Sequence, residues 1–125
     1  MIETLTVEGW PAPIGPFSMG KKAGGFLFLS GQTGTGEDGG IVPGGVVAEA
    51  EAIMKRLEQL LKAAGASFDD VIDVNCFLTD MNDFNAFNQV YAKYFTSKPA
   101  RTCVAVKALP LGATCEVRAT VYLGE

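Results

Sequence analysis

The sequence predicts an α+β fold in which two helices pack on one face of a small sheet, in the order β-β-α-β-α-β-β. Two segments carry apolar residues at spacings of three and four, as amphipathic helices do. The segments around them are short, rich in β-forming residues and bounded by glycine or proline. The 125 residues match the length of one domain, and 48% of them are apolar against 19% charged, which suffices for a compact core. We therefore expect a single domain over residues 1–125.

The first two strands are predicted to form a hairpin. Phe26–Ser30 is a short apolar strand, and the Gly24-Gly25 pair before it predicts a turn from a partner strand over residues 18–22. Residues 10–16 contain three prolines, and residues 34–45 contain six glycines and one proline. Both of these stretches are expected to be irregular.

The first helix has the most regular pattern in the chain. Its apolar positions alternate between spacings of four and three, which places them on one helical face: Val46, Ala50, Ile53, Leu57, Leu60 and Ala64. Two acid-before-base pairs four residues apart, Glu51 with Lys55 and Glu58 with Lys62, fall on the solvent side. Gly65 is the expected end of this helix.

A strand and a second helix follow. Val71–Leu78 is β-rich and apolar on both faces, which predicts a covered strand. The helix after it carries an apolar stripe made of Phe84, Phe87, Tyr91 and Tyr94. Asp80 or Asn82 is its expected N-cap.

Two alternating segments, Thr102–Val106 and Cys115–Leu123, are predicted to be the last strands. If Val104 and Val106 point to the helices, then Arg101, Cys103 and Ala105 point to the opposite face. That face has no partner within the chain and is partly apolar. Such a surface is usually buried against another subunit, so we expect an oligomer.

Composition excludes several classes of function. Ten lysines and arginines against fourteen acids give a net charge of −4, which argues against binding a nucleic-acid backbone. The chain contains no histidine, which excludes Ser-His-Asp and Cys-His pairs and any metal site with an imidazole ligand. Acid-base chemistry must therefore come from a carboxylate, a thiol, a lysine, a tyrosine or a bound water.

The cysteines and the chain start predict a soluble, cytoplasmic protein without a metal. Cys76, Cys103 and Cys115 are an odd number and lie far apart, so they fit neither a closed zinc site nor a disulfide framework. The first residues lack the basic and apolar regions of a signal peptide. The longest apolar run, Phe26–Leu29, is far too short to cross a membrane.

One motif match is rejected on physical grounds. Gly34-Thr-Gly36-Glu-Asp-Gly39 fits the GxGxxG pattern of dinucleotide-binding turns and follows a strand. Its two acidic residues would sit beside a pyrophosphate, and the Gly40–Pro43 segment cannot open the helix that must face it. We interpret this segment as a glycine-rich loop.

Arg101 and Cys103 are the first candidate site residues. Arg101 opens a strand just after Pro99, so its guanidinium is presented as a fork that can bind a carboxylate through two hydrogen bonds. On the residues alone, a surface or interface salt bridge is the favoured interpretation. Cys103 points to the same side as Arg101, and the nearby cation is expected to lower its pKa. A packing role is still favoured for this thiol, because no base is available to activate it.

Glu116 is the candidate acid-base group. It lies in an apolar strand whose alternation puts Cys115, Val117, Ala119 and Val121 on one face and Glu116 with Arg118 and Thr120 on the other. Two interpretations stay open: a solvated carboxylate paired with Arg118, and a carboxylate in a cleft that moves a proton. Ser30 and Asn88 carry no chemical signal by themselves.

A set of ordered motifs gathers these residues. They are Ile14-Gly-Pro-Phe17, Leu29-Ser-Gly-Gln32, Ala63-Ala-Gly-Ala66, Phe77-Leu-Thr-Asp-Met-Asn-Asp-Phe84, Asn88-Gln-Val-Tyr91 and Lys98-Pro-Ala-Arg-Thr-Cys103. Together they resemble the YjgF/Rid family of reactive intermediate deaminases, also known as the L-PSP or translation-inhibitor endoribonuclease family. The resemblance runs from about Pro13 to Val121.

The resemblance implies a chorismate-mutase-like fold and a homotrimer with active sites in the clefts between subunits. The implied activity is the cofactor-independent hydrolysis of 2-imino acids, such as 2-iminobutanoate and 2-iminopropanoate formed from 2-aminoacrylate and similar intermediates, to 2-keto acids and ammonia. By motif, Arg101 would hold the substrate carboxylate and Cys103 would line the pocket. Glu116 would position or activate the water, and Ser30 and Asn88 would be polar pocket residues.

The chain departs from the family pattern at Phe17, where the family has a tyrosine. Phe17 keeps an apolar wall but has no hydroxyl to donate or accept a hydrogen bond. Two alternatives therefore remain beside imine hydrolysis. One is RNA cleavage, a label that the family also carries, and the other is a non-catalytic module that binds a small carboxylate.

Overall fold

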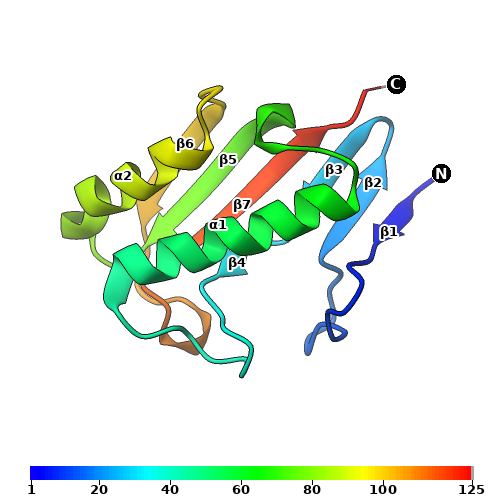
Figure 1. Cartoon of the computed structure of the whole chain (residues 1–125). Helices are drawn as coiled ribbons and strands as arrows, with labels where there is room; N and C mark the ends of the chain where they lie inside the picture. Colours follow the sequence, from blue (N-terminus) through cyan, green and yellow to red (C-terminus); the bar gives the residue numbers. More distant parts are fainter. Residues whose placement is uncertain (125) are drawn as a thin grey trace.

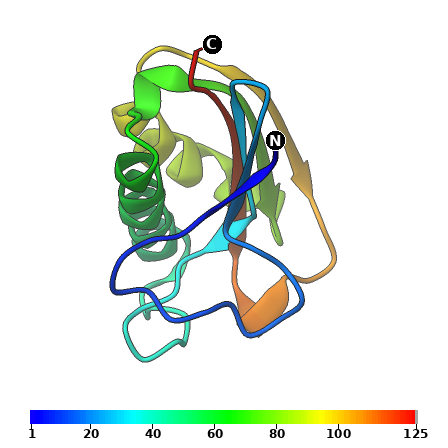
Figure 2. The same ribbon diagram turned by 90° about the vertical axis from the view of Figure 1, so that its right-hand side faces the viewer.

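The computed structural model describes residues 1–124 as a seven-stranded sheet with two helices on one face (Figures 1 and 2). The strands are β1 (Glu3–Leu5), β2 (Gly20–Ala23), β3 (Phe26–Leu29), β4 (Gln32–Thr33), β5 (Val71–Leu78), β6 (Ala100–Ala105) and β7 (Cys115–Tyr122), and the helices are α1 (Gly45–Ala63) and α2 (Phe84–Tyr94). The order across the sheet is β1-β2-β3-β7-β5-β6, and β4 also pairs with β7. The predicted α+β class and the one-sided helix cover are confirmed.

The predicted elements fall where the sequence places them, and two strands are additional. The hairpin is formed by β2 and β3, with Ala23 opposite Phe26. The extra strands β1 and β4 are three and two residues long. Neither is long enough to show the alternation by which a strand is detected in a sequence.

The helix α1 ends as its sequence predicts. Its core-facing side chains, Ala50, Ile53, Leu57 and Leu60, are fully buried. Gly65 follows with φ +73, a left-handed conformation that glycine adopts without strain, and its N–H donates to the carbonyl of Lys62. The GxGxxG segment before α1 does not open the helix: it folds back on itself, with the Val42 N–H donating to the Gly34 carbonyl at 2.9 Å.

Residues 81–83 form a short 3₁₀ turn before α2 begins at Phe84. The side chain of Asp80 accepts a hydrogen bond from the Asn82 N–H at 2.9 Å, so Asp80 is the cap, but of this turn rather than of the helix. A two-step start of this kind leaves no separate capping side chain for α2 itself.

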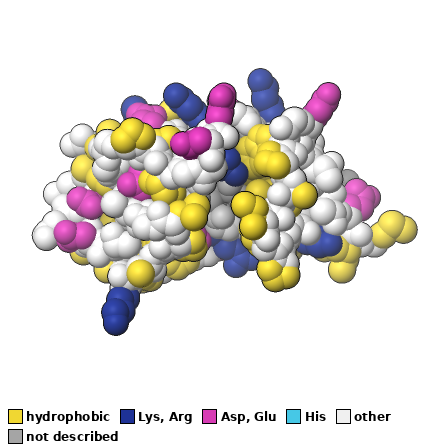
Figure 3. Space-filling view, turned by 90° about the horizontal axis from the view of Figure 1, so that it is seen from below, with side chains coloured by type: hydrophobic (Ala, Val, Ile, Leu, Met, Phe, Trp, Pro, Cys, Tyr) yellow, Lys and Arg dark blue, Asp and Glu magenta, His cyan; other side chains and the backbone are white. Residues whose placement is uncertain are grey.

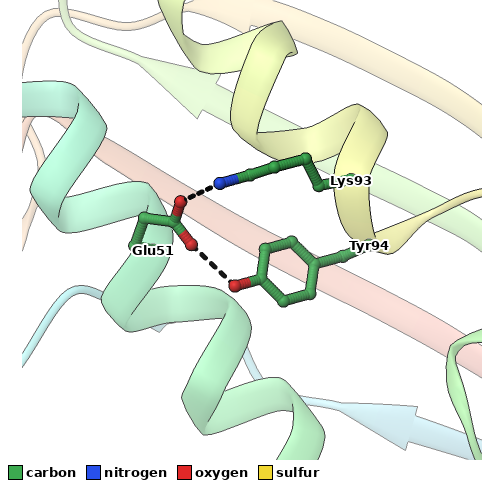
Figure 4. A network of polar contacts seen from close by, with 3 residues as sticks. All are labelled: Glu51, Lys93 and Tyr94. Carbon is green, nitrogen blue, oxygen red and sulfur yellow. Dashed lines mark hydrogen bonds and ion pairs between the residues drawn. The ribbon is translucent and has the colours of Figure 1, made fainter.

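A polar network joins the two helices on their solvent side (Figure 4). Glu51 of α1 accepts a hydrogen bond from the Tyr94 hydroxyl at 2.6 Å and forms an ion pair with Lys93. The hydrogen bonds from Lys93 and then Tyr94 lower the pKa of Glu51. The predicted partner Lys55 acts on Glu51 only at longer range, because the α2 side chains occupy its carboxylate.

The side-chain orientation in β7 follows the prediction, and that in β6 reverses it. Cys115, Val117, Ala119 and Val121 are buried under the helices, which we call the helix face, and Glu116 points to the other side, the open face. In β6, Arg101 pairs in parallel register with buried Val74, and Cys103 pairs with buried Cys76. Paired residues share a face, so Arg101 and Cys103 lie on the helix face and Val104 on the open face.

The reversal has a physical reason. β6 is the edge strand, and α2 covers its helix face only in part, so a polar residue such as Arg101 is tolerated there. The open face is itself apolar, with Phe28, Val104 and Tyr122 each about two-fifths exposed. Alternation alone therefore could not tell which set of β6 side chains faces the helices.

Neither helix within residues 1–124 is both long enough and apolar enough to span a bilayer. The described residues also contain no cluster of three or more cysteines and acids that could hold a metal ion.

Candidate active site

Arg101 is held on one face of α2 by neutral groups. Its Nη1 donates to the Asn88 side-chain oxygen at 2.6 Å. The guanidinium carbon lies 4.7 Å from the centre of the Tyr91 ring and 5.6 Å from that of Phe84. Positions 84, 88 and 91 are spaced by four and three, so they lie on the same side of the helix.

Arg101 has no carboxylate partner in the part of the chain that the structure describes. The one ion pair recorded there joins Lys93 and Glu51. The salt bridge favoured for Arg101 on the residues alone is therefore not formed within residues 1–124. The rings of Phe84 and Tyr91 and the amide of Asn88 orient the guanidinium without neutralising it. Its positive charge is therefore free to bind an anion.

A hollow of about 480 Å³ opens beside this arginine. Its lining combines the polar groups of Asn88 and Arg101 with the mostly apolar surfaces of Tyr91, Ala92, Phe95, Thr96, Lys98 and Pro99. Lys98 lies two residues before β6 and has φ +57, a strained conformation for a residue with a side chain.

Cys103 lies next to the arginine, but burial has the larger effect on the pKa of its thiol. Burial raises the pKa of Cys103, and the opposing effect of Arg101 is the smaller one. The expected lowering of this pKa is therefore wrong in its net direction. Burial also raises the pKa of the neighbouring Cys76 to about 12. Neither thiol is prepared to act as a nucleophile.

Glu116 has the features of a desolvated carboxylate. Burial raises the pKa of Glu116 above the ordinary value of 4.5. No hydrogen-bond or ion-pair partner of this carboxylate is found among the described residues. Arg118, its expected partner, instead donates from Nε to the carbonyl of Leu29 at 3.1 Å. The interpretation of Glu116 as a group paired with Arg118 is therefore not supported.

Ser30 and Phe17 lie on two chain segments that hydrogen bonds join. The Ser30 hydroxyl donates to the Ser18 carbonyl at 2.6 Å, and the Ser30 N–H donates to the Met19 carbonyl at 2.8 Å. This ties the start of β4 to the segment that carries Phe17. Glu116 lies against Gly31, the residue after Ser30: a Cβ added at Gly31 would be 2.9 Å from the carboxyl carbon.

Apolar side chains surround this end of the sheet. The loops over residues 12–18 and 106–114 lie at the same end of the molecule (Figures 1 and 2). Figure 3 looks at this end and shows hydrophobic side chains gathered on both sides of a central depression. The exposed apolar residues of these loops include Ile14, Phe17 and Leu111.

The candidate residues thus form two groups on opposite faces of one sheet. Arg101, with Asn88 and Cys103, belongs to the helix face at the β6 edge. Glu116 belongs to the open face of β7, and β5 lies between these two strands. The two charged groups of one chain therefore cannot approach the same small molecule.

A sequence model of the endoribonuclease L-PSP family matches residues 8–123. The chain belongs to this family. Among L-PSP relatives, the HMF1 protein of Saccharomyces cerevisiae is 45% identical over 95% of both chains. The mouse protein named 2-iminobutanoate/2-iminopropanoate deaminase is 43% identical over 91% of this chain and 86% of its own length.

The fold is shared with solved structures of the L-PSP family. The crystal structure of Escherichia coli TdcF with bound serine matches with a TM-score of 0.89 and 31% identity, over 98% of this chain and 99% of that one. The expected membership of the YjgF/Rid family is therefore confirmed.

Sequence reasoning missed three residues of this L-PSP site. In the sequence, Phe84 and Tyr91 belong to the apolar stripe of the second helix, and the structure adds that their rings also hold Arg101. Their spacing from Asn88 in α2 was the available signal. Gly31 was part of a motif without a role, and only the three-dimensional structure shows that Glu116 lies against it.

Proposed function

We propose that the protein is a 2-imino acid deaminase that hydrolyses 2-iminobutanoate and 2-iminopropanoate to the 2-keto acids and ammonia. The observation that carries this proposal is Arg101, an oriented guanidinium with no counter-ion within residues 1–124. Such a group is suited to the carboxylate of a small substrate. The name of the mouse relative and the serine bound to TdcF, a small amino acid, support the same substrate class.

The site is completed by a second copy of the chain. Arg101 and Glu116 lie on opposite faces of their own sheet, so one subunit supplies the Arg101 group and its neighbour supplies the Glu116 group. The apolar open face, which includes Phe28 and Val104, is buried in the same assembly. The family resemblance implies three subunits.

The mechanism needs one carboxylate clamp, one water and one base. The fork of Arg101 binds the substrate carboxylate and so fixes the position of the adjacent C=N carbon. Glu116 takes a proton from water as the water oxygen bonds to that carbon and the C=N bond becomes single, and the protonated Glu116 then gives this proton to the nitrogen. In the resulting carbinolamine, Glu116 takes the hydroxyl proton and passes it to the nitrogen, so that the C–N bond breaks, ammonia leaves and the C=O bond of the keto acid forms. An imine beside a carboxylate is already electrophilic, so these steps need no cofactor.

RNA cleavage is the second candidate, because the matching family is described as an endoribonuclease. The chain has a net charge of −4 and no histidine, which leaves this reaction without the basic surface and the imidazole pair that it commonly uses. The Arg101 and Glu116 groups together supply the carboxylate-binding cation and the base that imine hydrolysis requires.

The test is the release of ammonia and keto acid from freshly generated 2-iminobutanoate, with single-stranded RNA as a parallel substrate. The proposal expects turnover of the imine and none of the RNA, and both results should be the same after metal chelation. Binding of 2-ketobutanoate without turnover would establish the non-catalytic carboxylate module instead. RNA cleavage that disappears in Arg101→Ala would establish the nuclease.

Phe17→Tyr should increase the rate of imine hydrolysis. Phe17 is half exposed, and the tyrosine found at this position in the family would add one hydroxyl to the pocket. One hydrogen bond made in the transition state is worth about 1.4 kcal/mol, which corresponds to about tenfold in kcat. Steady-state kinetics of the two proteins measures this. An equal or lower kcat would mean that the pocket is adapted to the phenyl ring.

A further inference from the structure

We propose that Gly31 is a positioning residue: its missing side chain creates the space in which the Glu116 carboxylate lies. This inference rests on the proposed function, because it assigns Gly31 a role through the base of that reaction. It adds a residue that touches no substrate in the mechanism above and acts on the orientation and the pKa of Glu116.

The steric relation between the two residues is direct. A Cβ built on Gly31 overlaps Oε2 of Glu116 and lies 2.9 Å from its Cδ and 3.3 Å from its Cγ. These three atoms belong to one side chain, and no other neighbour comes as close to the added atom. Any side chain at position 31 would therefore displace the carboxylate.

The backbone does not itself require glycine at this position. The glycines with a positive φ in this chain, such as Gly24 and Gly25, serve turns where other residues would be strained. Gly31 is not among them. An alanine there meets no strain from a positive φ, so the cost of the substitution falls on Glu116.

Gly31 cannot move aside, because both neighbours are anchored. Ser30 is held by hydrogen bonds to the carbonyls of Ser18 and Met19. Gln32 is almost fully buried: its Nε2 donates to the Ser30 carbonyl at 3.2 Å, and its Oε1 accepts from Nε of Arg56 at 3.0 Å.

The contacts that hold Gln32 continue through Arg56 to Trp10. The Arg56 guanidinium carbon lies 4.2 Å from the centre of the Trp10 ring. The indole N–H of Trp10 in turn donates to the side chain of Gln59 at 2.7 Å. The backbone at Gly31 is thus a fixed wall, and an added methyl group would move the carboxylate rather than the wall.

The closing experiment is Gly31→Ala, alone and combined with substitutions of Glu116. We expect kcat for 2-iminobutanoate to fall on the order of a hundredfold, since a displacement of about 1 Å has that effect on an oriented group. Binding of 2-ketobutanoate should persist, because Arg101 of the neighbouring subunit holds its carboxylate and Glu116 does not. The acid limb of the kcat profile should move to lower pH, as the carboxylate is pushed toward solvent.

Coupling to Glu116 distinguishes positioning from general damage. In the Glu116→Gln background, Gly31→Ala should lower kcat no further. Gly31→Ala should lower the free energy of unfolding of the unsubstituted protein. In the Glu116→Ala background the same substitution should leave the free energy of unfolding unchanged. Gly36→Ala is the matched control, since its added Cβ meets only an ordinary contact at 3.4 Å with Val42.

Three results would overturn the inference: native kcat and acid limb in Gly31→Ala, additive losses with Glu116→Gln, or an equal stability loss in the Glu116→Ala background. The stability measurements need no substrate. If the unsubstituted protein turns over no imine, the proposed function fails by itself, and the stability coupling still decides whether Gly31 creates the space for the carboxylate.

Discussion

Arg101→Ala should abolish measurable binding of 2-ketobutanoate and lower kcat/KM for 2-iminobutanoate on the order of a thousandfold. Two charge-assisted hydrogen bonds from one fork contribute about 4 kcal/mol, and each 1.4 kcal/mol is a factor of ten. Arg101→Lys keeps the charge but loses the fork, so it should also be severely impaired. Calorimetric titration with the keto acid and steady-state kinetics measure the two effects.

The matched control for Arg101 is Lys62→Ala, which removes an equal charge from an exposed position of α1. Binding and turnover in this variant should be native. If Arg101→Ala bound the keto acid with native affinity, the carboxylate site would have to lie elsewhere. Asn88→Ala should reduce keto-acid binding less than Arg101→Ala does, because Asn88 orients the guanidinium without carrying its charge.

Glu116→Gln should lower kcat by about a hundredfold or more while binding of 2-ketobutanoate persists. Glutamine keeps the size of the side chain but cannot accept the proton from water. In the unsubstituted protein, kcat should decline on the acid side at a pH above the ordinary carboxyl pKa of 4.5, since burial raises the pKa of Glu116 and only the ionised form is a base. A native rate in Glu116→Gln would show that Glu116 is not the base.

Glu116→Gln should lower kcat but raise the stability of the protein at neutral pH. A carboxyl group whose pKa is raised by folding stabilises the protonated form, and stability declines as the pH rises through the raised pKa. Glu116→Gln removes this decline. Its Tm should equal that of the unsubstituted protein at about pH 4 and exceed it at about pH 7. A lower Tm at neutral pH would mean that the ionised carboxylate has stabilising partners.

The fold was predictable because local patterns agree with the tertiary structure in most elements. Leu57 and Leu60 repeat at helical spacing, and Gly65 ends the helix with the positive φ that its sequence position suggests. The orientation of β6 was not predictable. Arg101 lies on the helix face because α2 supplies it with an amide and two rings, and alternation contains no information on such long-range partners.

The sequence indicates candidate residues for the site, but it does not indicate that they lie on two opposite faces of the sheet. The motifs indicate Arg101 and Glu116, but sheet register decides that they emerge on opposite faces. The net pKa direction of Cys103 also depended on burial, which outweighs the visible cation two residues away. The role of Gly31 was not predictable from the sequence, because its contact with Glu116 joins segments far apart in the chain.

Subunit complementation tests most directly whether the site is shared between copies. Arg101→Ala and Glu116→Gln chains can be coexpressed with different affinity tags, and mixed trimers purified through both tags. Whatever its composition, each mixed trimer contains one site in three with an intact Arg101 from one chain and an intact Glu116 from its neighbour. Light scattering confirms the assembly, and trimers of each variant alone give the baseline. The account predicts that mixed trimers regain about a third of native turnover, whereas mixed trimers as inactive as either variant alone would contradict it.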